Sequence, residues 1–184
     1  ARFAAEIEGA HAYPCDVCDP VQLEATLAKI RGELGTPSVL VHNAVGGAFG
    51  SFLDVDPAVL AHNFDVNVMA LLRLARALAP DMVAAGKGAI VVTGNTSALR
   101  GKASFAGFAP TKAAQRILAE SIAREVGPKG VHVAYVVIDA VIEGIQLRRI
   151  MVADNEVATA RLDELLNASV LTLESDDAHT AALV

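Results

Sequence analysis

Along this chain, short runs of apolar residues alternate with longer amphipathic stretches. The runs predict strands, and the stretches, in which apolar residues recur every three to four positions, predict helices. The predicted strands are 11–15, 38–42, 89–93 and 131–138, and the predicted helices are 21–34, 56–84 and a third from 104 or 107 to 126. The run 38–42 does not alternate, which is typical of a parallel strand covered on both faces. The order predicts a single α/β domain over residues 1–184.

Aspartate–proline pairs mark the starts of the first two helices. Asp19 and Asp56 each precede a proline. An aspartate cap followed by proline in the first turn is typical of a helix N-terminus, because proline needs no hydrogen-bond acceptor there. We therefore expect these helices to begin directly after the two aspartates.

The periodic pattern weakens beyond Asp139. Short helical segments are predicted at 145–151, 155–167 and 176–183, and no further strand is recognised. Residues 140–184 are therefore expected to form a variable region on the substrate side. The sheet is expected to end with the strand 131–138.

Composition and charge limit the classes of function. The chain has 184 residues, of which 53% are hydrophobic, and its formal net charge is −6. Disorder is excluded by the apolar content, and the acidic balance disfavours binding to nucleic acid or to an anionic membrane. The longest apolar run, 133–138, is too short to span a bilayer. These features predict a soluble, cytoplasmic protein.

Two cysteines, Cys15 and Cys18, have the spacing of a redox dithiol or half of a zinc site. A redox pair needs its first cysteine at a helix N-terminus, whereas Cys15 follows a segment predicted to be extended. Zinc needs two further ligands at matching spacing, which the scattered histidines do not supply. We therefore expect no metal site.

Candidate chemistry lies where the third predicted strand ends and the third predicted helix begins. Phe108 and Lys112 are four residues apart, so on a helix they point the same way. The connection to Asn95 is short, and both side chains are expected to face the loop at Asn95.

Four segments follow a known family in order and spacing. They are 40–44 (LVHNA), 65–68 (DVNV), 90–94 (IVVTG) and 105–114 (FAGFAPTKAA). With them the chain resembles the short-chain dehydrogenase/reductase family over about residues 15–139. The resemblance implies a Rossmann-like, doubly wound parallel sheet and hydride transfer between NAD or NADP and a carbonyl or alcohol. It also implies a homodimer or homotetramer, in which the two long helices pair across a two-fold axis.

The same resemblance assigns roles to individual residues. Asp16 and Val17 would hold the adenine ring, and Asn43 and Ala44 would line the cofactor. Lys112 would hold ribose hydroxyls. Two asparagines complete the assignment, since Asn67 would position a water molecule and Asn95 would orient the substrate.

The chain departs from the family's pattern at several of these positions. Phe108 stands where the family has its catalytic tyrosine and offers no proton, and Asn95 stands in the place of the substrate-orienting serine. The glycine-rich turn that binds the cofactor pyrophosphate would precede Ala1. The glycines of segment 46–50 lack its spacing and are expected to form a flexible loop. The chain is thus expected to be a fragment lacking the first strand–turn–helix unit and the last strand.

Several alternatives stay open. Lys112 could be a solvated helix lysine, although the ribose role is favoured, and Asn67 could serve a relay or a purely structural role. His42 is expected to be a buried packing residue. The leading hypothesis is an NAD(P)-dependent oxidoreductase with an impaired or altered site. The alternatives are a non-enzymatic binding or dimerisation protein of this fold, and a repurposed hydrolase or lyase.

Overall fold

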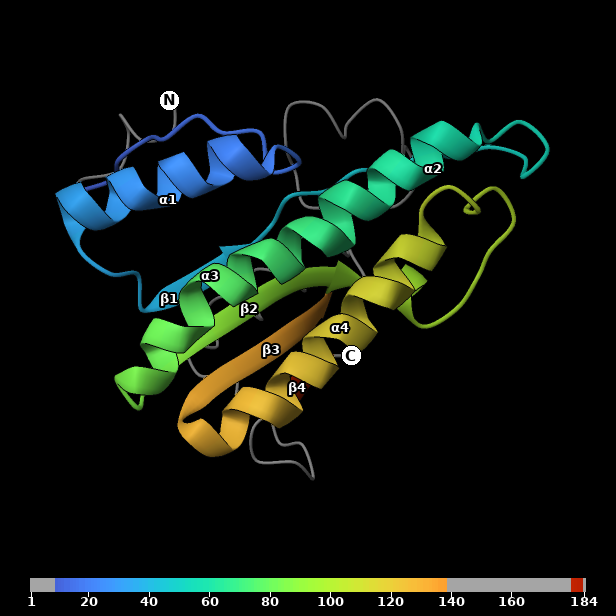
Figure 1. Ribbon diagram of the computed structural model, residues 1–184. Coiled ribbons are helices and arrows are strands. Elements are labelled where there is room, and N and C mark those ends of the chain that lie inside the picture. The colour runs from blue at the N-terminus through green and yellow to red at the C-terminus, as the bar shows by residue number, and fades with distance from the viewer. Residues whose placement is uncertain (1–8, 139–179, 184) are drawn as a thin grey trace.

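The computed structural model describes residues 9–138 and 180–183. Within them, helices and parallel strands alternate along the chain (Figure 1). No helix in this part of the chain combines the length and apolar content needed to cross a membrane. The helices are α1 (Pro20–Leu34), α2 (Pro57–Phe64), α3 (Ala70–Ala84) and α4 (Ala109–Val126), with a π-helical turn (Asp65–Met69) and two 3₁₀ turns (Thr96–Ala98 and Gly127–Lys129). The strands are β1 (Val39–His42), β2 (Gly88–Asn95), β3 (Val131–Ile138) and β4 (Thr180–Leu183).

The helix starts predicted from the aspartate–proline pairs are confirmed. Asp19 Oδ1 accepts hydrogen bonds from the backbone N–H groups of Val21 at 2.9 Å and Gln22 at 3.0 Å. Asp56 Oδ1 accepts one from Ala58 N at 2.8 Å. Each aspartate thereby pairs amide groups that the first turn of a helix leaves without an intrahelical partner.

The long helix predicted over 56–84 is present, but one of its turns is wider than an α-turn. Between α2 and α3 the chain forms a π-helical turn over Asp65–Met69, in which Ala70 N donates to the carbonyl oxygen of Asp65 five residues earlier. Such single wide turns shift the register of a helix and are frequent at functional sites. Here the turn carries Asn67.

The sheet is parallel throughout, as predicted. Its strands lie in the order β1-β2-β3-β4, with Leu40 opposite Ile90 and Ile90 opposite Val133. Two predictions about its ends are wrong. Segment 11–15 forms no strand, and 180–183 is a strand paired with β3, although a helical segment was expected there and the sheet was expected to end with 131–138. A short apolar run becomes a strand only where a neighbouring strand completes its hydrogen bonds, and β3 supplies that neighbour to β4.

The described helices cover one face of this sheet (Figure 1). Each right-handed crossover places its helix on the same face as long as the strand order advances in one direction, as it does here. In β1, Leu40 and His42 are buried beneath the helices, whereas Val39 and Val41 on the opposite face are 56% and 58% exposed. The prediction that 38–42 is covered on both faces is therefore wrong within the described residues, which contain one helical layer of a doubly wound fold.

Aliphatic side chains fill the layer between the helices and the sheet. Leu71 of α3, Ile90 of β2, and Val131 and Val133 of β3 are almost fully buried there. Alanines allow the helices to approach the sheet closely, since Ala70 and Ala123 show no exposed surface. This packing fixes the position of α4 over the end of β2.

Candidate active site

The structure brings several of the predicted site residues together where β1 and β2 end. Asn43 and the half-buried Ala44 directly follow β1, and Asn95 is the last residue of β2. Thr93 connects these strand ends to α4. Its hydroxyl donates to Asn43 Oδ1 at 2.7 Å, and its carbonyl oxygen accepts from Lys112 Nζ at 3.0 Å. Ligands of open parallel sheets bind at this carboxyl edge.

Lys112 is buried, with 2% of its surface exposed. Its ammonium donates to the Thr93 carbonyl and to Gln115 Oε1. Burial disfavours the charged form and lowers the pKa of Lys112 to about 8. The alternative of a solvated surface lysine is therefore wrong. The ammonium group of Lys112 lies at the sheet edge with a pKa not far above neutral pH.

The side chain of Asn67 holds the loop after β1 in place. Its Oδ1 accepts from Gly46 N at 2.9 Å, while its Nδ2 donates to Gly46 O and to Thr111 Oγ1, both at 2.7 Å. The backbone carbonyl of Asn67 accepts from Gln115 Nε2 at 2.8 Å. Asn67 is fully buried; its bonds with Thr111 and Gln115 are buried as well, and its two bonds with Gly46 are partly buried. Its side chain has the structural role that was one of the two alternatives.

Phe108 occupies the N-cap position of α4, and its ring packs against the loop after β1. Its ring centroid lies 5.2 Å from that of Phe49, and a methyl group added at Gly47 would come within 2.8 Å of the Phe108 ring. Only 7% of Phe108 is exposed. Its carbonyl accepts from Thr111 Oγ1 at 2.7 Å. The ring thus lies one turn before Lys112 without a proton to donate.

Asn95 lies at the predicted edge, but part of its side chain is already engaged. Its Oδ1 accepts from Ser97 N at 3.0 Å and caps the 3₁₀ turn that follows β2. An asparagine has one side-chain acceptor and an NH₂ group with two donors. With the oxygen bound to Ser97, the NH₂ group is the part suited to orienting a substrate.

The predicted adenine-binding residues, Asp16 and Val17, lie in a turn before α1. Asp16 Oδ1 accepts from Cys18 N at 2.9 Å. Burial, together with the neighbouring Asp65, raises the pKa of the Cys18 thiol to about 11. The thiol therefore stays protonated. Among the described residues, no cluster of three His, Cys, Asp or Glu side chains could hold a metal ion.

The glycine segment 46–50 is fixed by hydrogen bonds rather than free, in contrast to the flexible loop expected from its composition. Gly46 N donates to Asn67 Oδ1, and Gly50 N donates to Ser104 O at 2.9 Å. Asn63 Nδ2 donates to Gly107 O at 2.9 Å, which holds the facing loop as well. Because the amide groups of Gly46 and Gly50 already have acceptors, the segment is poorly suited to cradle a phosphate.

Two polar side chains that face this site were not singled out from the sequence. Gln115 is fully buried and contacts both Lys112 and Asn67, and Thr111 contacts Asn67 and Phe108. Gln115 lies three residues after Lys112, which places both on one helix face. An amide one turn after Lys112 on the same helix face was the signal available for Gln115.

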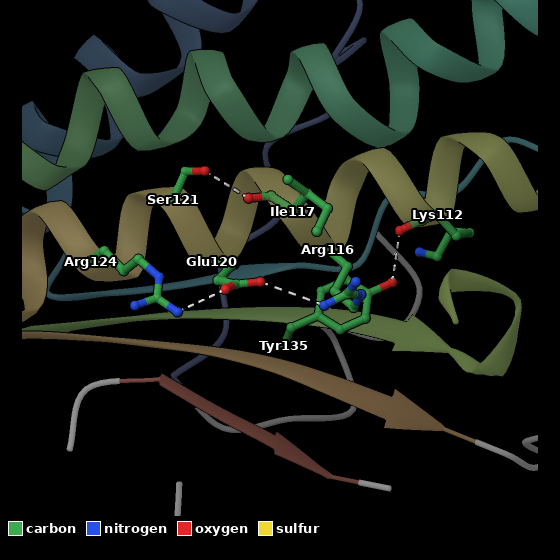
Figure 2. A network of polar contacts seen from close by, with 7 residues as sticks. All are labelled: Lys112, Arg116, Ile117, Glu120, Ser121, Arg124 and Tyr135. Atoms are coloured by element: carbon green, nitrogen blue, oxygen red, sulfur yellow. Dashed lines mark hydrogen bonds and ion pairs between the residues drawn. The ribbon is translucent and has the colours of Figure 1, made fainter. Parts of the chain in front are cut away.

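Tyr135 does not replace the missing tyrosine. Figure 2 shows it on β3 beneath α4, where its hydroxyl donates to the Lys112 carbonyl at 3.3 Å. Burial raises the pKa of Tyr135 to about 12, and its ring lies against Gly94 in the core.

The expectation that His42 is a buried packing residue is confirmed. Burial lowers its pKa, and its Nε2 has no hydrogen-bond partner within the described residues.

Comparison with known proteins agrees with this geometry. The family model described as short chain dehydrogenase matches residues 1–143. This chain belongs to the short-chain dehydrogenase family. Among curated members, the oxidoreductase UcpA of Escherichia coli K12 is 32% identical over 126 residues, covering 66% of this chain and 47% of UcpA.

Solved structures of short-chain dehydrogenases share the fold. One from Streptomyces avermitilis superposes with a TM-score of 0.75 at 26% identity, covering 100% of this chain and 74% of that one. A 7α-hydroxysteroid dehydrogenase complexed with NADH and 7-oxo glycochenodeoxycholic acid gives a TM-score of 0.68 at 27% identity, covering 74% of this chain and 55% of that one. This short-chain dehydrogenase chain spans about half the length of the curated relatives it matches.

Proposed function

We propose that this chain is part of an NAD(P)-dependent oxidoreductase that acts on a carbonyl or alcohol. The observation that carries the proposal is the buried ammonium of Lys112, held at 3.0 Å from the Thr93 carbonyl at the carboxyl edge of a parallel sheet. A buried charge is unfavourable unless it is paired, and buried groups with a shifted pKa cluster at functional sites. A buried lysine at the ligand-binding edge of a sheet is therefore a candidate functional residue. Because the chain belongs to the short-chain dehydrogenase family, we assign hydride transfer to this site.

The residues present fit part of a dinucleotide. Lys112 supplies donors suited to ribose hydroxyls, and Asn43 and Ala44 lie at the same strand edge. Asp16 uses one carboxylate oxygen for its own turn, and the second oxygen can accept from an adenine amino group. The starts of α1 and α2 are poorly suited to hold the pyrophosphate because aspartates cap them, and segment 46–50 is poorly suited because the amide groups of Gly46 and Gly50 are already hydrogen-bonded within the chain. We therefore assign pyrophosphate binding to residues outside these three segments.

The dinucleotide, when bound, supplies or accepts the hydride. The residues of this chain would position the reactants, with Lys112 on the ribose and the Asn95 NH₂ group on the substrate oxygen. Phe108 has no ionisable group, and general acid–base assistance is typically worth about 10²–10⁴ in rate. Carbonyl reduction is therefore expected to be slow unless another acid or a water molecule delivers the proton.

Calorimetric titration of the full-length protein with NADH and NADPH tests the cofactor assignment. Binding is expected for the wild type and is expected to be lost in Lys112→Met. Lys29→Met is the matched control, because the Lys29 side chain is 62% exposed on α1. No dinucleotide binding by the wild type, or unchanged binding in Lys112→Met, would contradict the proposal.

A second experiment tests whether the site lacks a proton donor because Phe108 stands in the place of a tyrosine. Phe108→Tyr in the full-length protein restores a hydroxyl one turn before Lys112 and is expected to raise the turnover of carbonyl substrates by up to about 10². If the wild type reduces carbonyls at ordinary rates and Phe108→Tyr slows it, another group is the acid and our assignment of Phe108 is wrong.

Phe108 also favours a second candidate function, a non-enzymatic protein that keeps the fold for binding or dimerisation. Its ring packs on Phe49 and on the backbone of Gly47, as a core residue would. Dinucleotide binding without turnover in the wild type and in Phe108→Tyr would favour this candidate. In either case we propose a homodimer or homotetramer that pairs the helical segment 57–84 with α4, because Val59 of α2, Met69 of the π turn and Ile117 of α4 are exposed apolar side chains.

A further inference from the structure

Gln115 occupies a position between two residues of the proposed site. It lies one turn after Lys112 on α4 and is fully buried against the π turn that carries Asn67. Its Oε1 accepts from the Lys112 ammonium, and its Nε2 donates to the Asn67 carbonyl at 2.8 Å. One side chain thus links the lysine to the π turn directly.

The chemistry of the amide suits both contacts at once. The ammonium of Lys112 needs acceptors, while the carbonyl of Asn67 needs a donor, and a glutamine offers one of each at its tip. Because the donor end is fixed on Asn67, the acceptor end faces Lys112. A methionine of similar length would supply neither contact, and a glutamate would supply an acceptor with a negative charge.

A buried ammonium depends strongly on such acceptors. Lys112 is 2% exposed, so water cannot replace a lost partner easily, and Thr93 O at 3.0 Å supplies its other hydrogen bond in the described residues. Hydrogen bonds to a charged group stabilise it more than bonds between neutral groups. The oxygen of Gln115 therefore favours the protonated form of Lys112 and fixes the direction of its side chain.

We propose that Gln115 is a positioning residue, which holds the Lys112 ammonium at the sheet edge in the orientation and charge state that a dinucleotide ribose requires. This inference rests on the proposed function for the role of the ribose. The link between Gln115 and Lys112 itself is a property of the protein without cofactor, and it can be measured separately.

Other titratable groups around Lys112 do not change charge near neutral pH. His42 on β1 has a pKa lowered by burial, and Tyr135 on β3, which contacts the Lys112 carbonyl, has a pKa raised to about 12. Arg116, the next turn along α4, forms an ion pair with Glu120 at 3.5 Å (Figure 2). A titration observed in the slightly alkaline range therefore belongs to Lys112.

The test is a pH titration of the Lys112 side chain by NMR in the full-length protein, without cofactor. Its signal is assigned as the one that Lys112→Arg removes. Gln115→Met is expected to lower the titration midpoint, and Gln115→Glu is expected to raise it, each by about one to two pH units. Ser121→Ala, an exposed substitution on the same helix, is the control and is expected to leave the midpoint unchanged.

The opposite signs separate positioning from packing. A residue that only packs α4 against the π turn would destabilise the fold in both variants without moving the midpoint in opposite directions. Midpoints that stay within 0.3 pH units of the wild type (about a twofold change in protonation equilibrium), or that move the same way in both variants, overturn the proposal. If Gln115→Met does not fold, the direction of the shift in Gln115→Glu decides alone.

Dinucleotide affinity in the same variants distinguishes this inference from the proposed function. At pH 7, Gln115→Met is expected to bind NADPH or NADH about tenfold more weakly than the wild type, in line with the loss of one charged hydrogen bond. Shifted midpoints in a protein that binds no dinucleotide would support the positioning of Lys112 and overturn the oxidoreductase assignment. Dinucleotide binding with unmoved midpoints would do the reverse.

Discussion

Replacing Asn67 by alanine should show how strongly the loop after β1 depends on one amide. The side chain is fully buried and makes three hydrogen bonds, two with the backbone of Gly46 and one with Thr111 Oγ1. Asn67→Ala removes all three and leaves the Gly46 N–H and C=O without these partners. Because the bonds with Gly46 are partly buried and the bond with Thr111 is buried, hydration offsets only part of the loss.

The magnitude follows from the number of bonds. A typical net contribution is about 1 kcal/mol per hydrogen bond, and a buried group left unpaired costs about 1–3 kcal/mol. Three bonds, two of which leave backbone groups unpaired, give an expected loss of about 3 kcal/mol in the free energy of unfolding. With a urea dependence of about 2 kcal/mol per molar, the unfolding midpoint should fall by about 1.5 M.

Urea unfolding of the full-length protein, followed by circular dichroism, measures this loss. Asn43→Ala is the matched control, because Asn43 is exposed and its side chain accepts a single hydrogen bond, from Thr93. The control is expected to change stability by less than about 0.5 kcal/mol. Equal midpoints for the two variants would refute the view that the Asn67 amide holds the loop.

Three further predictions concern charge, packing and assembly. The pKa of Lys112 is about 8 in the folded protein against 10.5 for a free lysine, so the unfolded chain binds more protons between these values, and stability should rise with pH from 8 to 10.5. The unfolding free energy of the wild type relative to Lys112→Met should therefore increase by about 3 kcal/mol over that range, and a constant difference would contradict the burial of the charge. Gly47→Ala should cost about 1–3 kcal/mol, because its methyl group would lie 2.8 Å from the Phe108 ring, and the cost should shrink in a Phe108→Ala background as measured by a double-mutant cycle. Light scattering of the full-length protein should give a dimer or tetramer, since Val59 and Ile117 are 41% and 50% exposed on α2 and α4, and a monomer at micromolar concentration would rule this out.

The sequence by itself determined the order of the elements and the family. Asp19 and Asp56 fixed two helix starts because their carboxylates and the following prolines act locally, within one turn. Residues 131–138 form a strand because the apolar run 133–138 suits a buried parallel strand. The spacing between Asn95, Phe108 and Lys112 predicted that Phe108 and Lys112 both face the loop at Asn95. Lys112 reaches this strand edge, where it contacts Thr93, whereas Phe108 packs on Phe49 in the loop after β1.

Only the tertiary structure decided what depends on contacts between distant segments. Residues 11–15 lack a paired strand and 180–183 have one, although local composition suggested the opposite. The burial of Lys112 follows from the packing of α4 over β2 and the π turn, whereas its proximity to Gln115 is local, since the two residues lie three apart on one helix. A polar side chain in a sequence is compatible with solvent or with a buried partner, and the choice is made by the chain that covers it.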